Sequence, residues 1–563
     1  MMILKRSLKP VIIMLIILSC TEKKDQARFE SELKSLDLLR GDITLCGSGE
    51  SQFGNVKFGL SCSEKAKADF NLATALLHSF EYPEAEKVFA KVIDEDPECL
   101  MAYWGAAMCN FHPLWDAPSQ NDLQKGARII ALARSLKSDN SSRESDYLEA
   151  IAVIYDQWEE LDYKTRLLKF ERASEKIFEK YPEDHEAAIF YSLALRASAD
   201  PNDKSFTNQK KAGEILNKVY AKEPDHPGIA HYIIHTFDYP DLAELALPAA
   251  RKYASIAVAS PHAQHMPSHI FTRLGLWDES IQSNINSVSA AQCYAENMGI
   301  DGHVDEELHG MDYLVYAYLQ KADDDKAREQ IEYSETMEDV FPQNFKVGYS
   351  FAAMSARYAL ERKDWAMAAK LELYPAGFPW ENYSWEKSNI NFGRLLGAVH
   401  TKNLSAAKDE LKQLELIHRK LTDAKESYKA NLVLIQIKIS DGWIKFAEGN
   451  KEEAIKLLIN AADMEDATEK HSVTPGEVIP ARELLADMYL ESGQPARALE
   501  AYEADLKRHP NRFNGLYGAG QAARKSGDMN KARLYFDQLL AIADPESDRP
   551  ELLLAKSFVR DNI

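Results

Sequence analysis

The sequence lacks the motifs of several common enzyme classes. It has no Walker or dinucleotide-type glycine loop, no Gly-x-Ser-x-Gly turn in a strand-to-helix context and no His-Glu-x-x-His motif. The usual sequence support for an ATPase, a serine hydrolase or a zinc protease is therefore missing. Lysine and arginine are not concentrated in any segment, and the formal net charge is -21. Because binding to nucleic-acid phosphates needs clustered positive charge, we expect no nucleic-acid partner.

Long apolar runs are also missing after residue 18. The eight-residue run Val11–Leu18 is too short to span a bilayer, which takes roughly 20 apolar residues. A basic start that includes Lys5, Arg6 and Lys9 precedes this run. Residues 1–19 are therefore typical of an export signal, although an uncleaved signal anchor remains an alternative.

The end of this segment, Ile17-Leu18-Ser19-Cys20, resembles the lipobox of bacterial lipoproteins. The resemblance implies that Cys20 is lipid-modified and anchors an exported chain to a membrane. Thr21 follows where inner-membrane lipoproteins carry Asp, which implies the outer membrane, with the protein facing the periplasm or the cell surface. The competing interpretation of Cys20 is a chance cysteine.

Cysteine is scarce, with six residues in 563. Export implies an oxidising compartment, so the cysteines after Cys20 are expected to form disulfides rather than metal sites. Their odd number leaves at least one thiol free, and Cys109, in an apolar helical context, is the candidate. Cys46 with Cys62 and Cys62 with Cys99 are both possible pairs. The full set is Cys46, Cys62, Cys99, Cys109 and Cys293.

From about Ala66 onward the apolar pattern is helical, interrupted by short turns of Gly, Pro, Asp and Asn. The clearest repeat places Gly493, Ala498 and Tyr502 against matching residues 34 residues later, and 34 is the tetratricopeptide period. The matching residues are Gly527, Ala532 and Phe536. We predict an all-α fold, a tetratricopeptide-like α-solenoid of stacked helical hairpins that forms a superhelix with a concave groove.

Further segments resemble a widespread group of exported bacterial tetratricopeptide lipoproteins; they are Ala75–Phe80, Met101–Gly105, His265–Ile270 and Pro480–Leu485. The resemblance covers roughly residues 60 to 545 and implies the fold, but little chemistry. The predicted segments are a signal peptide (1–19), a lipid anchor with tether or cap (20–62), N-terminal repeats (63–225), histidine-rich repeats (226–340), helical repeats with an aromatic loop (341–440) and C-terminal repeats (441–563).

Histidine is concentrated between residues 226 and 312, which hold eight of the fifteen histidines. The pair His231 and His235 recurs 34 residues later as His265 and His269, so successive repeats carry the same pair. Residues four apart lie on one helix face with Cβ atoms ~6 Å apart, and such a pair can direct two imidazoles at one point. Pro267 lies inside the second pair, however, and is expected to kink or break that helix.

A third repeat is aligned at an offset of 47 residues, which places His309 opposite His262, Asp312 opposite His265 and Tyr316 opposite His269. Imidazole and carboxylate groups together are typical ligands of Zn, Fe or Cu. The residues of this hypothetical metal site are His231, His235, His265, His269, His309 and Asp312, with Tyr313 and Tyr316 as candidate proton donors.

Three interpretations of the histidines remain open: a metal or catalytic site, a polar groove that binds a ligand without metal, and structural histidines in the core. The leading functional prediction is a lipid-anchored scaffold that binds a protein, a peptide or a small ligand in its groove. The alternative is a metal-dependent enzyme or metal-binding protein that uses the histidines. The sequence leaves open whether the protein is an enzyme.

Overall fold

The computed structural model describes residues 28–44, 46, 52–114, 117–136, 142–201 and 203–561. The predicted signal peptide and Cys20 lie outside these residues. The chain divides into two compact units, which are Met1–Ile43 with Phe53–Tyr232, and Thr44–Gln52 with Ile233–Ile563. The predicted boundary at 225/226 falls near this division, whereas those at 340/341 and 440/441 fall inside unit 2.

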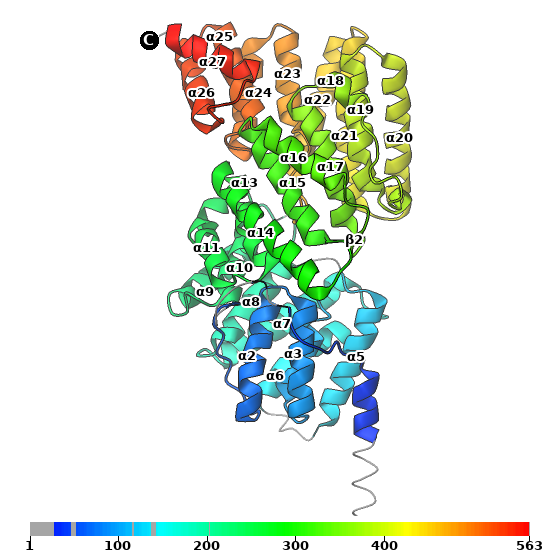
Figure 1. Ribbon diagram of the computed structural model, residues 1–563, viewed down its shortest axis with the longest axis vertical. Coiled ribbons are helices and arrows are strands. Elements are labelled where there is room, and N and C mark those ends of the chain that lie inside the picture. The colour runs from blue at the N-terminus through cyan, green and yellow to red at the C-terminus, as the bar shows by residue number, and fades with distance from the viewer. Residues whose placement is uncertain are drawn as a thin grey trace, which may run out of the picture. The chain divides into compact units, whose positions relative to one another are not determined.

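The helices of unit 1 are α2 (Glu64–His78), α3 (Tyr82–Glu95), α4 (Leu100–Met108), α5 (Gln120–Ser135), α6 (Arg143–Tyr155), α7 (Tyr163–Lys180), α8 (His185–Ser198), α9 (Thr207–Tyr220) and the first part of α10 (Pro227–Phe237). In unit 1 each helix from α2 to α8 packs on the next along the chain (Figure 1). Side chains cap the starts of α2, α5, α6, α7 and α8. The hydroxyl of Ser63 accepts from the N–H of Ala66, and the carboxylate of Asp184 accepts from the N–H of Ala187.

Unit 2 continues the same pattern and contains two short parallel strands, in which His303 pairs with Val340. Its first elements are α11 (Ala243–Ile256), α12 (Pro261–His265), α13 (Pro267–Arg273), α14 (Trp277–Met298), β1 (His303–Val304), α15 (Asp305–Gln320), α16 (Asp324–Ser334), β2 (Val340–Phe341), α17 (Phe345–Glu361) and α18 (Trp365–Ala368). The later elements are the 3₁₀ helix η1 (Trp380–Asn382), α19 (Ser384–His400), α20 (Leu404–Asp423), α21 (Ser427–Ala447), α22 (Lys451–Ala467), α23 (Ala481–Glu491), α24 (Pro495–Arg508), α25 (Phe513–Ser526), α26 (Met529–Ile542) and α27 (Pro550–Asp561).

Small residues facing aromatic rings hold the C-terminal hairpins together. A Cβ atom on Gly518 would overlap the ring of Tyr502, and one on Gly520 would overlap the ring of Phe536. Ala498 and Ala532 are fully buried beside these contacts. Tyr502 and Phe536, the aromatic residues of the 34-residue repeat, therefore pack closely against glycines of the intervening helix. The repeat glycines Gly493 and Gly527 instead have positive φ and open space around them. The fold class is the predicted one, an all-α solenoid of stacked helical hairpins.

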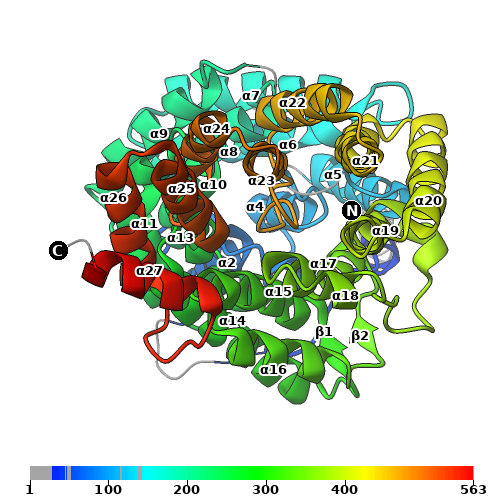
Figure 2. The same cartoon turned by 90° about the horizontal axis from the view of Figure 1, so that it is seen from above.

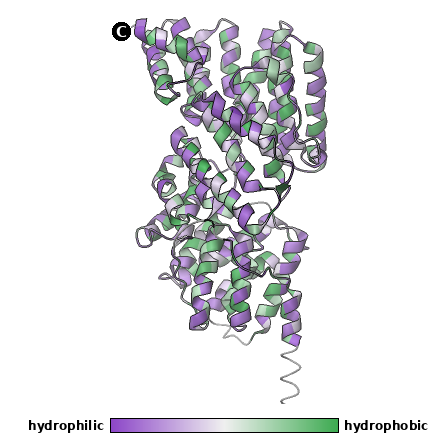
Figure 3. Ribbon diagram, in the orientation of Figure 1, coloured by the Kyte–Doolittle hydropathy of each residue, from purple (hydrophilic) through white to green (hydrophobic). Residues whose placement is uncertain are grey.

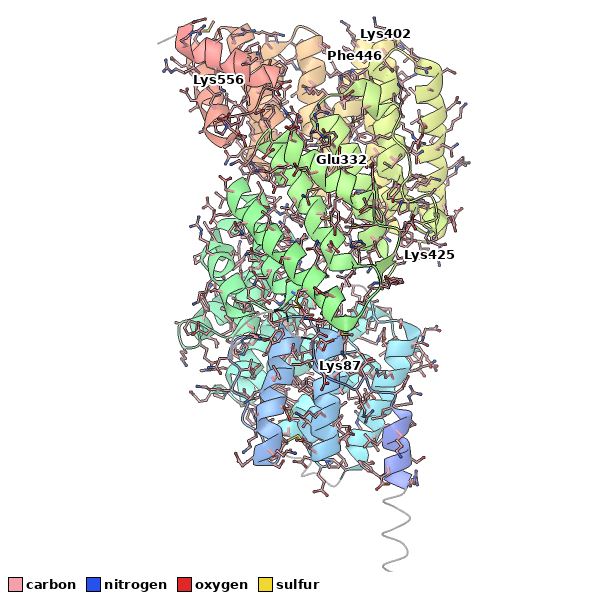
Figure 4. The ribbon with its side chains drawn as sticks, viewed as in Figure 1. Lys87, Glu332, Lys402, Lys425, Phe446 and Lys556 are labelled. Carbon is pink, nitrogen blue, oxygen red and sulfur yellow. A yellow bond between two sulfur atoms is a disulfide. The ribbon has the colours of Figure 1, made fainter. Side chains whose placement is uncertain are left out.

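The helices of unit 2 form an inner and an outer set. Helix α17 contacts α19 and α19 contacts α21, while α20 and α22 pack outside them (Figure 2). Lys402 and Lys425 lie at the two ends of the outer helix α20 (Figure 4). Helices in both sets show hydrophilic and hydrophobic residues side by side, as expected for helices that bury one face (Figure 3). No helix among the described residues is long and apolar enough to cross a membrane.

Four cysteines form two disulfides. Cys62 bonds to Cys99, one of the two predicted pairings, in unit 1. Cys46 bonds to Cys293, 247 residues later, which excludes its predicted alternative partner Cys62. The sequence left the two pairings open and did not name Cys293 as a partner, because α14 brings Cys293 to the N-terminal segment, a contact that sequence spacing does not reveal. Cys109 is a free, buried thiol, as expected.

Candidate functional site

Pro267 divides the helix that carries His265 and His269. Helix α12 ends at His265 and α13 begins at Pro267, so Met266 is the junction between them. Met266 nevertheless keeps right-handed helical dihedral angles, with φ -52° and ψ -37°. The chain therefore continues with little change of direction, and the Nε2 atoms of His265 and His269 lie 3.0 Å apart. The break expected at Pro267 is present, yet both rings point to the same place.

His309 on α15 completes a group of three imidazoles within unit 2. The ring centroids of His265 and His309 are 4.3 Å apart. One ring nitrogen from each of His265, His269 and His309 lies within 4.8 Å of the other two. The three residues expose only 1%, 2% and 5% of their surface. This group, named the triad below, is small enough for one ion to contact all three rings.

Hydrogen bonds behind two of the rings fix their tautomers. Nδ1 of His265 lies 2.7 Å from Oδ1 of Asn284. The amide nitrogen of Asn284 donates to the carbonyl oxygen of Ser280 at 2.8 Å, so its oxygen must face the ring. Nδ1 of His265 therefore carries the proton. Nδ1 of His269 lies 3.1 Å from the carboxylate of Asp238 and carries its proton for the same reason.

The triad histidines are neutral at neutral pH. Burial lowers the pKa of His265 and of His309 well below the ordinary histidine range, and each is lowered further by a neighbouring triad histidine. Burial also lowers the pKa of His269, although the hydrogen bond to Asp238 raises it. With their Nδ1 protons committed to Asn284 and Asp238, the Nε2 atoms of His265 and His269 each present a lone pair to the other.

Asp238 is held in its ionised form by two cations. Burial opposes its ionisation, but Lys470 and Arg273 hold the pKa of its carboxyl well below the usual value. Nζ of Lys470 lies 3.1 Å from one carboxylate oxygen, and Nε of Arg273 lies 2.8 Å from the other. Burial in turn lowers the pKa of Lys470 to about 8. Asp238 therefore remains a hydrogen-bond acceptor behind His269.

Tyr313, a predicted proton donor, lies against the triad. Its hydroxyl is 3.4 Å from Nε2 of His269, and its ring centroid is 4.7 Å from that of His265. The hydroxyl also donates to the carbonyl oxygen of Val473 at 2.9 Å. Since this bond uses its proton, its oxygen turns lone pairs toward His269. Burial raises the pKa of Tyr313 well above its ordinary value, so it stays protonated.

Two other predicted residues on α15 have different partners. Asp312 is fully buried in an ion pair with Arg357 of α17. The alignment placed Asp312 level with His265, but Asp312 pairs with Arg357 instead. His309, one turn earlier on α15, is the residue that joins the triad. The hydroxyl of Tyr316 accepts from Arg512 at 2.9 Å. These contacts assign Asp312 and Tyr316 to buried ionic networks beside the triad.

The earlier histidine pair is divided between the units. His231 belongs to unit 1, where its Nδ1 donates to the carbonyl oxygen of His78 at 2.6 Å and its ring packs on Phe80. His235 belongs to unit 2, where its ring stacks on His262 with centroids 6.2 Å apart.

Unit 1 contains a second buried group, which the sequence analysis missed. The carboxylate of Glu186 bridges Nε2 of His78 and Nε2 of His226, each at 2.9 Å. The other ring nitrogen of His78 lies 2.9 Å from the hydroxyl of Tyr232. The available signal was two polar residues, His78 and Glu186, within apolar helical segments. Each histidine nitrogen that faces Glu186 therefore has a carboxylate oxygen as its hydrogen-bond partner, and the hydrogen bonds among these three side chains are satisfied.

A pocket lies on the inner helices of unit 2. Tyr349 of α17, Trp385 of α19 and Leu432 of α21 are among its apolar walls. The irregular segment 469–480 between α22 and α23 closes one side, with Lys470 and His471 among the lining residues. Because Lys470 also contacts Asp238, this segment links the pocket to the triad.

The family comparison agrees with the repeat pattern. Residues 484–548 match the model of a tetratricopeptide repeat family. These residues carry tetratricopeptide repeats. No curated protein matches the sequence. Among solved structures, the chain is similar to a human IFIT1 dimer with m7Gppp-AAAA, at 13% identity and a TM-score of 0.34, over 86% of this chain and 96% of that one.

Two further solved structures are similar to this chain. One is a tetratricopeptide repeat protein from Parabacteroides merdae, at 11% identity and a TM-score of 0.28, over 53% of this chain and 97% of that one. The other is the APC/C hetero-tetramer Cut9-Hcn1, at 11% identity and a TM-score of 0.29, over 88% and 90%. Within unit 2, α17, α19 and α21 each pack on the helix that follows them, and α19 contacts both α17 and α21.

Proposed function

We propose that this protein is an exported, lipid-anchored tetratricopeptide scaffold that binds a segment of a partner protein in the pocket on α17, α19 and α21. The repeat fold fits a protein-binding role, because successive first helices present many side chains on a rigid inner surface. The observation that carries the proposal is the pocket itself, which lies on α17, α19 and α21 and is lined mainly by apolar and aromatic side chains.

The chemistry of the lining favours a peptide with an apolar or aromatic anchor residue. Trp385 and Leu432 offer apolar surface, while Asn389 and Gln436 offer amide groups that suit a peptide backbone. Burial raises the pKa of Glu465, another lining residue, well above its ordinary value, and Glu477 raises it further. The lining therefore combines apolar walls with amide and titratable groups, a combination that suits an anchor residue and its peptide backbone.

Export and anchoring are supported by other features. The basic and apolar start of the chain and the Leu-Ser-Cys sequence ending at Cys20 are typical of a lipoprotein signal. The two disulfides suit an oxidising compartment such as the periplasm or the cell surface. Thr21 after Cys20 favours the outer membrane.

The test is selection of binders from a displayed library of random peptides, using the chain from Thr21 onward. Leu432→Glu places a charge in the pocket, and Leu416→Glu places the same charge on the outer helix α20, where Leu416 is 50% exposed. We expect peptides with an apolar anchor to bind the parent and Leu416→Glu chains, and to bind folded Leu432→Glu at least tenfold more weakly, about 1.4 kcal/mol. Equal binding to all three chains would refute the pocket as the binding site.

A further inference from the structure

We propose that His265, His269 and His309 bind one divalent transition-metal ion, with Zn²⁺ as the fitting probe. This proposal is independent of the peptide-binding function. It concerns a different set of side chains within unit 2.

The spacing of the donor atoms suits such an ion. Donors of a tetrahedral Zn²⁺ site lie about 2.0–2.1 Å from the metal and hence about 3.3 Å from one another. The Nε2 atoms of His265 and His269 are 3.0 Å apart, and a nitrogen of His309 lies within 4.8 Å of both. Small rotations of the rings would bring all three to metal-bonding distance.

The tautomers make the approach of these two nitrogens unfavourable unless a cation lies between them. Asn284 and Asp238 hold the protons of His265 and His269 on Nδ1, so neither Nε2 atom has a proton to donate to the other. Tyr313 donates its hydroxyl proton to Val473 and offers a further lone pair. Two imidazole nitrogens and a phenol oxygen thus converge as acceptors without a donor, an arrangement that a metal ion satisfies.

The same hydrogen bonds are those that support metal-bound histidines in proteins. A ligating imidazole typically donates its other N–H to a carboxylate or a carbonyl-type oxygen, which fixes the ring and increases its basicity. Asp238 supplies a carboxylate behind His269, and Asn284 supplies an amide oxygen behind His265. Both acceptors are themselves held, Asp238 by Arg273 and Asn284 by its bond to Ser280.

The histidine and glutamate group of unit 1 is an informative contrast. It also brings three ligand-type side chains within 4.8 Å, but Glu186 supplies an acceptor for each facing nitrogen of His78 and His226. Proximity alone therefore does not single out the triad. In the triad, by contrast, the Nε2 atoms of His265 and His269 face each other, and both are hydrogen-bond acceptors with no carboxylate between them.

The donor set also limits the metal. Three neutral imidazoles suit Zn²⁺, Cu²⁺, Ni²⁺ or Fe²⁺, whereas Mg²⁺ and Ca²⁺ need mainly oxygen ligands. Three protein ligands leave one tetrahedral position, next to the hydroxyl of Tyr313, for water or another small ligand. The triad is therefore assigned as a three-histidine site with one exchangeable position.

The experiment is a Zn²⁺ titration of the chain from Thr21 onward after chelator treatment, followed by calorimetry and thermal unfolding. We expect binding of about one Zn²⁺ per chain and a higher unfolding temperature, because the ion binds the folded state. The His265→Gln, His309→Gln double variant should lose this binding. His400→Gln, which alters a half-buried histidine elsewhere in unit 2, should retain it.

Two measurements on the parent chain keep the test valid if the double variant does not fold. Co²⁺ in place of Zn²⁺ should give visible absorption bands of a four-coordinate site, and Mg²⁺ should not compete. Anomalous scattering from a zinc-soaked crystal should place the ion among the three rings. Absence of Zn²⁺ binding by the folded parent, an ion located elsewhere, or full binding by the folded double variant would overturn the proposal.

Discussion

The amide oxygen of Asn284 lies 2.7 Å from Nδ1 of His265 and holds the proton of that ring away from His269. The geometry of the triad depends on this contact, because it leaves Nε2 of His265 as an acceptor. We therefore expect Asn284→Ala to weaken Zn²⁺ binding about 10- to 100-fold while the stoichiometry stays at one.

Asn391→Ala is the matched control. Asn391 is also a buried amide in unit 2, but it donates to Glu410. Competition with a chromophoric chelator measures both affinities. An unchanged affinity in Asn284→Ala, or an equal loss in Asn391→Ala, would show that the contact of Asn284 with His265 does not support metal binding.

The buried ion pair between Asp312 and Arg357 predicts a large effect on stability. Both side chains are fully buried, so Arg357→Met leaves a carboxyl that has lost its main partner. We expect a loss of roughly 3–5 kcal/mol in the free energy of unfolding, measured by urea denaturation of unit 2. The double variant Asp312→Asn, Arg357→Met should recover part of this loss. A loss below about 1 kcal/mol in the single variant would contradict the role given to the pair.

His400 predicts a dependence of stability on pH. Its ring stacks on Trp365 with centroids 3.9 Å apart, and burial lowers its pKa to about 4, although Asp487 raises it and Lys363 lowers it further. The unfolded chain, with a histidine pKa of about 6.5, binds more protons at this residue between about pH 6.5 and 4. Stability is therefore lost as the pH falls through this window, by up to about 3 kcal/mol at this residue.

Two measurements check this dependence. An NMR titration of the His400 ring should give a pKa about 2 units below that of a free histidine. In urea unfolding, the stability of the parent relative to His400→Gln should be constant above about pH 7 and should fall below about pH 6.5. If the stability difference between the parent and His400→Gln chains stays the same from pH 7 to pH 4, the assignment of His400 as a neutral, half-buried side chain is wrong.

Lipid anchoring predicts a specific role for Cys20. We expect the full chain to label with a fatty-acid analogue and to fractionate with the outer membrane, and expect Cys20→Ser to lose the label. Cys109→Ser is the control, since Cys109 is a buried thiol within unit 1. Labelling of Cys20→Ser at the parent level would contradict the lipoprotein assignment.

The sequence was most informative about contacts between residues that are close together in the chain. The 34-residue recurrence of small and aromatic residues predicted the fold, because contacts such as Gly518 with Tyr502 occur between neighbouring helices. Pro267 predicted the helix break because proline removes a hydrogen bond within its own helix. The helical angles of Met266, which keep His265 and His269 together across that break, are a tertiary outcome that the sequence does not specify.

The candidate site could be predicted only in part. His265, His269, His309 and Tyr313 were named as candidates from the sequence and do lie together. Asp312 was placed by an alignment that took no account of Arg357, a partner 45 residues away that neutralises it. The bond between Cys46 and Cys293 and the bridge from Glu186 to His78 also join distant segments, and one sequence contains no periodic signal for such pairs.

The most direct test of the account is the metal content of the protein as it occurs in its own membrane. We would solubilise the parent chain and the His265→Gln, His309→Gln variant, purify both without an affinity metal and measure metals by plasma mass spectrometry. The account predicts about one transition-metal ion per parent chain and less than about a tenth of that in the folded variant. A folded parent chain without bound metal, or a variant with the same metal content, would contradict it.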